Sequence, residues 1–375
     1  MEYINQFKNF ILNLINFEIF EIKQAWRTSI VCVVCLFVNE KWLKTEFPGW
    51  IIITAIVCLQ ANFGATIIRV KERLFGTIFG CAAAFVVTIL FQGNILIVVS
   101  LVLISCIFAI YNSVHTVYSY TYTVFFFTFG LISLYSLIFS DGVHFALLRV
   151  EDVAVGALFG TLGSLLLWPD FASNTFRKNL VDVVSETENL FQNIIDWVED
   201  KIKDDEVYNQ KVLSATNNQN ARNKIIEIYY ELGNRNYPLK EYEAFILSQE
   251  RIHFSLLTIY NLLRIHTFEK NYNSAHTLYL VEQLVSIQNY FRVCVARLPL
   301  TKEKALQLSQ GSQEYALIEK LEKEAINFIH SHQVDTDSQV TIQNISKHRS
   351  LLERLFEEVK SMNVEIDNII EFYMR

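Results

Sequence analysis

Long apolar runs dominate the first part of the chain. They extend over approximately residues 28–43, 48–66, 74–92, 95–111, 117–139 and 150–168. Most of them approach the ~20 residues that an α-helix needs to cross ~30 Å of hydrocarbon. The first run is the shortest, because Asn39, Glu40 and Lys41 end it. The pattern predicts an all-α membrane protein with a six-helix transmembrane domain over residues 28–169.

After Trp168 and Pro169, apolar residues recur at positions i, i+3, i+4 and i+7 with charged residues between them. This pattern predicts helices over residues 173–202, 218–232, 238–270, 273–297, 301–333 and 338–373. The expected breaks are the polar loop Asn217–Asn220 and the residues Gly233, Pro238 and Pro299. Opposite charges four residues apart, as at Glu319 and Lys323, indicate a solvated face. We expect an antiparallel helical bundle over residues 170–375.

The segment before the first apolar run, residues 1–27, is amphipathic. Between residues 3 and 22 it places Ile4, Phe7, Ile11, Leu14 and Ile15 at helical spacing, with Asn, Lys and Glu between them. Such a helix lies on the inner leaflet of a membrane or docks on the rest of the protein. The sequence favours neither alternative.

Composition and charge support this division. The chain is 52% hydrophobic and carries a net charge of −7, so a nucleic-acid partner is not expected. With both termini inside the cell, the cytosolic segments near the membrane contain Lys8, Lys23, Arg27, Arg69, Lys71, Arg73, Arg177 and Lys178. The outer loops contain only Lys41, Lys44 and Arg149. The positive-inside tendency therefore predicts two cytosolic termini and a cytosolic bundle.

The sequence contains no motif of common enzyme chemistry. Walker loops, dinucleotide-binding glycine patterns, nucleophile elbows and HExxH segments are missing from it. Cys32 and Cys35 form a CxxC inside an apolar run without a second pair, so we assign them to packing. The histidines of the tail have no metal-ligand spacing: His253, His266, His276, His330, His332 and His348. We therefore expect neither an enzyme nor a metal or cofactor.

An internal sequence repeat is the most informative feature of the chain. Residues 69–80 and 149–160 align without gaps at an offset of 80, with matching Arg69/Arg149, Val70/Val150, Gly76/Gly156, Phe79/Phe159 and Gly80/Gly160, and with Glu72 opposite Asp152. Each copy opens an apolar run, the third and the sixth. Three spans lie between them, so the copies would start at opposite faces. This predicts an inverted 3+3 repeat, as in many transporters.

The sequence repeat also contains the candidate functional residues. Gly76, Gly80, Gly156 and Gly160 favour close helix packing. Charged groups near the hydrocarbon usually face a partner or a wet cavity. Arg69, Arg73 and Arg149 would therefore stand at opposite ends of a pathway for an anion, whose carboxylate a guanidinium binds as a fork. Alternatively, Arg69 and Arg73 only hold their loop inside. Glu72 and Asp152 are proton-coupling candidates, or they neutralise the arginines structurally.

Aromatic residues gather between the fourth and fifth runs: Tyr111, Tyr118, Tyr120 and Tyr122, with His115 among them. Tyrosines at this depth usually form a membrane-anchoring belt. A vestibule in which rings stack on an aromatic substrate is the alternative. A lone histidine in a loop is usually solvated, so we do not assign a role to His115.

Several ordered motifs resemble one family. Arg-x-x-x-Arg-x-x-Gly-Thr-x-x-Gly in residues 69–80 and Leu-Gln-Ala-Asn-Phe-Gly-Ala-Thr in residues 59–66, which includes Gln60 and Asn62, resemble the fusaric acid resistance and aromatic acid exporter family. Ala61 stands where that family usually has proline. Arg149, Asp152 and Gly156, followed by Trp168-Pro169, resemble its last span. The resemblance covers about residues 20–170, and plant malate channels are distantly similar there.

The resemblance implies a multi-pass inner-membrane protein that exports aromatic or other organic carboxylates, using the proton gradient. Larger members of the family carry the six-span unit twice, so a homodimer is expected for this chain. An adaptor protein in the periplasm is a further expected partner. Two other functions remain open: a passive organic-anion channel, and a membrane scaffold that transports nothing.

Overall fold

A computed structural model describes residues 20–91, 94–115, 119–139, 142–232, 237–268, 274–299, 304, 308, 312–330 and 339–374. Over these residues the protein is entirely helical, with twelve α-helices and one π-helical turn, so the prediction of an all-α fold is confirmed there. The predicted N-terminal amphipathic helix falls almost wholly on residues 1–19, outside the described ranges. The chain divides into two compact units, residues 1–172 and residues 173–375.

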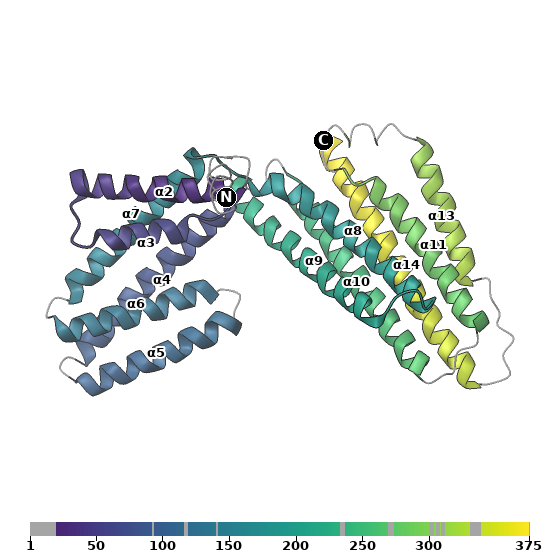
Figure 1. The fold of residues 1–375 in the computed structure, drawn as a ribbon, viewed down its shortest axis with the longest axis horizontal. Coiled ribbons are helices and arrows are strands. Elements are labelled where there is room, and N and C mark those ends of the chain that lie inside the picture. The colour runs from purple at the N-terminus through teal and green to yellow at the C-terminus, as the bar shows by residue number, and fades with distance from the viewer. Residues whose placement is uncertain are drawn as a thin grey trace, which may run out of the picture. The chain divides into compact units, whose positions relative to one another are not determined.

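Unit 1 contains α2 (Phe20–Val38), the π-helical turn η1 (Asn39–Leu43), α3 (Pro48–Cys58), α4 (Phe63–Leu90), α5 (Ile95–His115), α6 (Ser119–Ile138) and α7 (Gly142–Leu166). The helices α4 and α7 pack on each other in the middle (Figure 1). Helix α3 packs on α7 with α2 outside it, and α6 packs on α4 with α5 outside it. The two central helices therefore separate two outer pairs.

The central helices run antiparallel. The Cys81 thiol of α4 donates to the Ala146 carbonyl near the start of α7, at 3.7 Å. At the other end of the pair, the Thr66 hydroxyl donates to the Ser164 hydroxyl at 3.3 Å. Late residues of one helix thus meet early residues of the other.

Three helices of the described chain are long and apolar enough to cross a membrane: Phe63–Leu90, Ile95–Ser113 and Tyr120–Ile138. The other three predicted spans differ in detail. Helix α3 has only 11 residues and ends at Cys58, so the predicted span 48–66 is divided between α3 and α4. Helices α2 and α7 each carry three charged residues, in α7 Arg149, Glu151 and Asp152.

Two local features set the break between α3 and α4. Asn62 is the N-cap of α4, and its side-chain oxygen accepts from the Ala65 amide at 2.9 Å. At the preceding turn, the Arg27 guanidinium of α2 donates to the carbonyl oxygens of Gln60 and Ala61 at 2.6 and 3.1 Å. These bonds satisfy backbone groups that a helix end leaves free.

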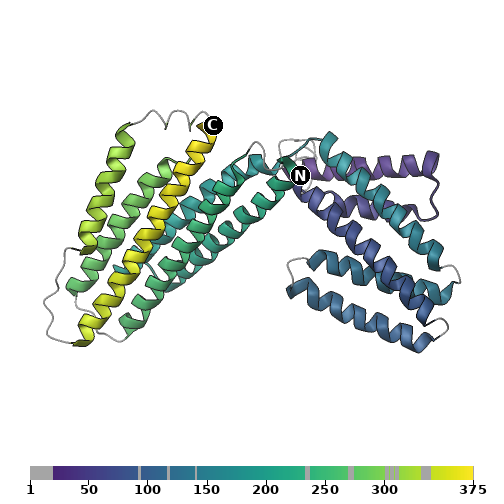
Figure 2. The same cartoon turned by 180° about the vertical axis from the view of Figure 1, so that it is seen from behind.

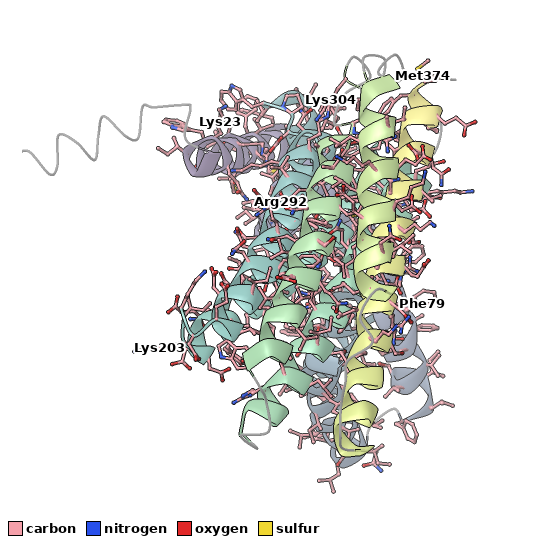
Figure 3. All side chains as sticks on the ribbon, turned by 90° about the vertical axis from the view of Figure 1, so that its right-hand side faces the viewer. Lys23, Phe79, Lys203, Arg292, Lys304 and Met374 are labelled. Atoms are coloured by element: carbon pink, nitrogen blue, oxygen red, sulfur yellow. The ribbon has the colours of Figure 1, made fainter. Side chains whose placement is uncertain are left out.

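Unit 2 contains α8 (Ala172–Val198), α9 (Asp204–Leu232), α10 (Leu239–Phe268), α11 (Ser274–Ala296), α13 (Ser312–His330) and α14 (Gln339–Met374), which run side by side as a bundle (Figures 1 and 2). The predicted loop Asn217–Asn220 is wrong, because α9 continues through it and Asn218 is buried. Charged side chains such as Lys203 project from the outside of the bundle (Figure 3). The pair Lys323–Glu319, at 2.7 Å, confirms the predicted charge-paired face.

Candidate functional site

Two arginines of unit 1 stack on aromatic rings in matching ways. The Arg149 Cζ atom lies 3.9 Å from the centroid of the Trp50 ring, and the Arg69 Cζ atom lies 4.0 Å from that of Tyr120. Such cation–π contacts contribute about 0.5–1 kcal/mol when exposed and ~2 kcal/mol when desolvated. The two arginines are 80 positions apart, and the two rings are 70 apart. One arrangement therefore occurs twice.

The glycines repeat the same correspondence. A Cβ atom built on Gly76 would lie 2.7 Å from the Thr121 carbonyl oxygen of α6, and one built on Gly156 would lie 2.5 Å from the Ile51 carbonyl oxygen of α3. Thr121 and Ile51 are again 70 positions apart. Glycine is required at both crossings because the facing backbone leaves no room for a side chain.

The second glycine pair continues the pattern one turn later. A Cβ atom on Gly80 would meet the Phe125 carbonyl oxygen at 2.7 Å, and one on Gly160 would meet the Ala55 carbonyl oxygen at 3.2 Å. Thus α4 crosses α6 as α7 crosses α3, with residue-by-residue equivalence over two helical turns.

Arg73 and Tyr120 form a polar contact inside unit 1. The Arg73 guanidinium is buried, and its Nη1 donates to the Tyr120 hydroxyl at 2.8 Å. Its Nε has no hydrogen-bond partner among the described residues. Tyr120 therefore holds two arginines, Arg69 by its ring and Arg73 by its hydroxyl.

Arg149 is the most deeply buried of the three predicted arginines, with 2% of its surface exposed. Within the described chain, its Nε and Nη1 have no hydrogen-bond partner. Asp152, one turn further along α7 and equally buried, interacts with it electrostatically. An unsatisfied buried donor costs about 1–3 kcal/mol, and more for a charged group. The fold thus retains a cation with free donors in its interior.

The structure brings Arg73 and Arg149 closer together than the sequence predicts. They lie on the antiparallel pair α4 and α7, whose register is set by the contacts at Cys81 and Thr66. In that register they are separated by about 10 Å along the helix axes. The two charges act on each other electrostatically. The two arginines therefore lie on either side of the middle of the α4–α7 pair, and not at opposite ends of a pathway through it.

Unpartnered hydroxyls accompany these arginines. The side-chain oxygens of Thr54 on α3, Thr77 on α4 and Thr128 on α6 are buried and have no hydrogen-bond partner in the described part of the chain. Thr77 follows Arg73 by one turn on the same helix face. Cationic and hydroxyl donors are therefore available along the helices that cross at the centre of unit 1.

The acidic candidates differ between the two halves. Glu72 forms an ion pair with Arg69 at 3.4 Å, and both side chains are partly exposed. Asp152 is 2% exposed, and no hydrogen bond satisfies the Nε and Nη1 of neighbouring Arg149 among the described residues. Arg69 is thus ion-paired with its acidic neighbour, whereas Arg149 keeps donors that have no hydrogen-bond partner in the described part of the chain.

Gln60 and Asn62 lie apart from these groups, in the turn between α3 and α4. The Gln60 side chain donates to the Val57 carbonyl at 2.8 Å, and its backbone amide donates to the Thr66 hydroxyl at 3.1 Å. Asn62 caps α4. Their hydrogen bonds shape the turn, and Arg27 fixes it from α2.

The sequence did not single out Trp50, and it assigned Tyr120 to an interfacial belt. The fixed offset of 80 that revealed the arginines fails for these rings, because α6 (20 residues) extends well beyond the length of α3 (11 residues). Trp50 aligns with Tyr120 only at an offset of 70, because the extra length lies within α6.

One known protein family matches this part of the chain. Residues 31–163 match the sequence model of the family described as fusaric acid resistance protein-like. This part of the chain is a fusaric acid resistance protein-like domain. It includes both arginine–aromatic stacks and both glycine pairs. The protein is therefore a membrane protein with several candidate transmembrane helices.

Two relatives match at 27% identity. One is a protein of Escherichia coli (strain K12) described as uncharacterized protein YhfK, aligned over 176 residues, which are 46% of this chain and 24% of the relative. The other is an uncharacterized protein of Haemophilus influenzae, aligned over 154 residues, 40% of this chain and 20% of the relative. The chain thus spans about a quarter or less of their lengths, and their descriptions assign no activity.

Proposed function

We propose that this protein is an inner-membrane secondary transporter that exports aromatic or other organic carboxylates. The observation that supports this function best is Arg149, a buried guanidinium with two free donors inside a fusaric acid resistance protein-like domain. A guanidinium offers paired N–H groups that match the two oxygens of a carboxylate. A carboxylate bound there would satisfy donors that the resting protein leaves unsatisfied.

Transport through this site requires a change of conformation. The free donor atoms of Arg73 and Arg149 are inaccessible in the structure, which resembles an occluded state. We propose that α2–α4 and α5–α7 form an inverted repeat whose halves rock against each other. The matched contacts of Gly76 and Gly156, and of Arg69 and Arg149, support the repeat.

In this proposal all six helices of unit 1 belong to the membrane, with both termini in the cytosol. Helix α2 continues into η1, so the pair extends over residues 20–43. The three charged residues of α7 include Arg149 and Asp152, which are buried within the protein and do not face lipid. The short α3 followed by a non-helical turn is compatible with a membrane, because protein groups bond that turn.

Glu72 and Asp152 are our proposed proton-coupling groups. Each lies three positions after an arginine of the repeat, Arg69 or Arg149. Protonation removes a negative charge beside that arginine and so changes its affinity for an anion. A proton-coupled carrier needs this property. Asn and Gln substitutions at these positions should separate anion binding from the response to pH.

We also propose that the single six-helix unit works as a homodimer. Among the described helices, α6 is the one on which α5 packs extensively. On α5 the side chains of four apolar residues are exposed: Leu96, Leu103, Ile107 and Ile110. Lipid or a second copy would cover this face. Crosslinking in native membranes together with the mass in nanodiscs tests the dimer, and a monomer by both methods would contradict it.

The function is tested by flux of a labelled hydroxybenzoate in proteoliposomes, with the pH gradient and the voltage imposed separately. Uphill movement driven by the pH gradient would support a coupled exporter, whereas conductance that follows voltage alone would identify a channel. Arg149→Gln should abolish flux, and Lys41→Gln, which removes an exposed cation in the turn η1, should not. Equal flux in both variants would remove Arg149 from the pathway.

A further inference from the structure

A polar pocket lies at the C-terminal end of α7, away from Arg149. Its volume is about 340 Å³, and it is lined by Lys23, Gln24, Arg27, Ala61, Trp168, Pro169 and Asp170. These residues come from the start of α2, the turn before α4 and the segment after α7. The pocket is thus separate from the two arginine–aromatic stacks.

Both signs of charge are held in this pocket. Arg27 is 3% exposed, and its Nη2 donates to the carbonyl oxygens of Gln60 and Ala61, which fixes the guanidinium. Asp170 interacts with it electrostatically. The Asp170 carbonyl oxygen accepts from the Phe63 amide at 3.0 Å, which fixes the other side of the pocket. Because Asp170 offsets Arg27, Lys23 supplies the remaining positive charge.

The pocket lies where the apolar surface of α7 ends. The apolar part of α7 ends at Leu166, and Leu165 and Leu166 are exposed by 43% and 71%. Trp168 follows with 42% of its surface exposed. Tryptophan is enriched at the level of lipid headgroups. Figure 3 labels Lys23 near the start of α2. A lysine at the edge of an apolar segment can extend its ammonium group towards lipid headgroups.

We propose that this pocket binds the headgroup of phosphatidylethanolamine from the cytosolic leaflet. The lipid phosphate would bond Lys23 and Gln24, the primary ammonium would bond Asp170, and the acyl chains would lie along Leu165 and Leu166. A purely anionic headgroup would leave Asp170 beside a negative charge. A choline headgroup has no N–H to donate to that carboxylate. The inference uses the proposed orientation in the membrane and is independent of what is transported.

The test is native mass spectrometry of the full chain in nanodiscs of phosphatidylcholine with added phosphatidylethanolamine or phosphatidylglycerol. We expect the wild-type protein to retain phosphatidylethanolamine about three- to tenfold more than either other lipid, as for a partly buried ion pair. Asp170→Asn, which keeps the shape of the side chain, should abolish the preference over phosphatidylglycerol. Lys23→Gln should lower retention of both phospholipids.

Lys41→Gln is the matched control, since Lys41 is exposed in η1, beyond the opposite end of α2 from Lys23. Gln24→Glu is a second variant, which keeps the side-chain length but places a negative charge near the phosphate. It should reduce retention of phosphatidylethanolamine while the melting temperature stays unchanged. Stronger retention of phosphatidylglycerol by the wild type would overturn the proposal. Equal behaviour of the Asp170, Lys23 and Lys41 variants would also overturn it. Both of these outcomes are judged from lipid retention alone, so they do not depend on whether the protein transports hydroxybenzoate.

Discussion

Arg149 lies over the ring of Trp50 at 3.9 Å, although the two residues are 99 positions apart in the chain. The contact joins α7 to the first turn of α3 and places a guanidinium face against an apolar wall. The Nε and Nη1 atoms of Arg149 have no hydrogen-bond partner in the described structure. The ring fixes the position of the cation without neutralising it, which leaves the charge available to a ligand.

Replacing Arg149 by Met and Asp152 by Leu together should abolish transport and stabilise the protein. The double substitution removes a buried cation whose donors are unsatisfied together with the buried carboxylate beside it. We therefore expect the melting temperature to rise by an amount equivalent to about 1–3 kcal/mol. Labelled-anion flux in proteoliposomes and thermal unfolding in the same detergent measure the two effects. A gain in stability with loss of flux would identify a group retained for function.

Arg69→Met is the matched control, because Arg69 makes the equivalent ring contact but is partly exposed and paired with Glu72. Its removal should change the unfolding free energy by less than about 1 kcal/mol. If the Arg149→Met/Asp152→Leu variant has a lower melting temperature than the Arg69→Met variant, the buried charges stabilise the fold, contrary to our expectation.

Gly156→Ala should destabilise unit 1 strongly. An added Cβ would lie 2.5 Å from the Ile51 carbonyl oxygen and 2.6 Å from the Thr54 Cβ, so α7 must move away from α3. Overpacking of this kind costs about 1–3 kcal/mol, measured as a lower melting temperature of the purified protein. Gly160→Ala should cost less, because its closest contacts are at 3.2 Å.

Gly49→Ala provides the control for helix crossings. Nothing lies within 4 Å of a Cβ built there, although Gly49 is also in α3. Alanine should be neutral at this position or slightly stabilising, because it has the higher helix propensity. If Gly49→Ala destabilised the protein as much as Gly156→Ala, the loss of stability would come from replacing any glycine and not from the close contact between helices.

The helical content and the internal sequence repeat were predictable from sequence, because both depend on local patterns. The break after Cys58 was not, since the chain stays apolar from Pro48 almost to Thr66. It depends on Arg27, which bonds Gln60 and Ala61 from more than 30 positions away. Similarly, α9 continues through Asn217–Asn220 because packing buries Asn218, against its weak local propensity.

The chemistry of the candidate site was only half predictable. Arg73 and Arg149 stood out because charges are rare in apolar runs. Their partners Tyr120 and Trp50 did not, because aromatic residues are common there: the chain contains 17 Tyr and 5 Trp. Which ring meets which arginine depends on how α6 crosses α4 and how α3 crosses α7, and these crossings are long-range properties.

Tyr120→Phe should isolate the role of the tyrosine hydroxyl. The variant keeps the ring that contacts Arg69 but removes the acceptor of the 2.8 Å bond from Arg73 Nη1. We expect a loss of about 1–3 kcal/mol in unfolding free energy, because Arg73 then has a further unsatisfied donor. A double-mutant cycle with Arg73→Met measures the coupling. Additive effects in the cycle would contradict a direct Arg73–Tyr120 interaction.

Unit 2 should lose stability in acid through His253. This histidine of α10 is buried and lies 3.0 Å from the Ser214 hydroxyl of α9. Burial, with a smaller contribution from the charge of Lys211, lowers the pKa of His253 to about 4. The unfolded chain, with a histidine pKa near 6.5, therefore binds more protons below that pH. Stability falls as the pH drops from about 6.5 to 4 and the loss is complete below 4, at about 2–3 kcal/mol.

Hydrogen exchange of α9 and α10 in the detergent-solubilised full chain, measured between pH 4 and 8 with correction for the intrinsic rates, tests this dependence. His253→Leu should remove its contribution, so that the difference in protection between variant and wild type changes with pH only within that window. Ser214→Ala is the control, since it deletes the hydrogen bond but leaves the imidazole buried, and the pH dependence should persist. An identical pH profile in wild type and His253→Leu would show that other groups carry the acid sensitivity.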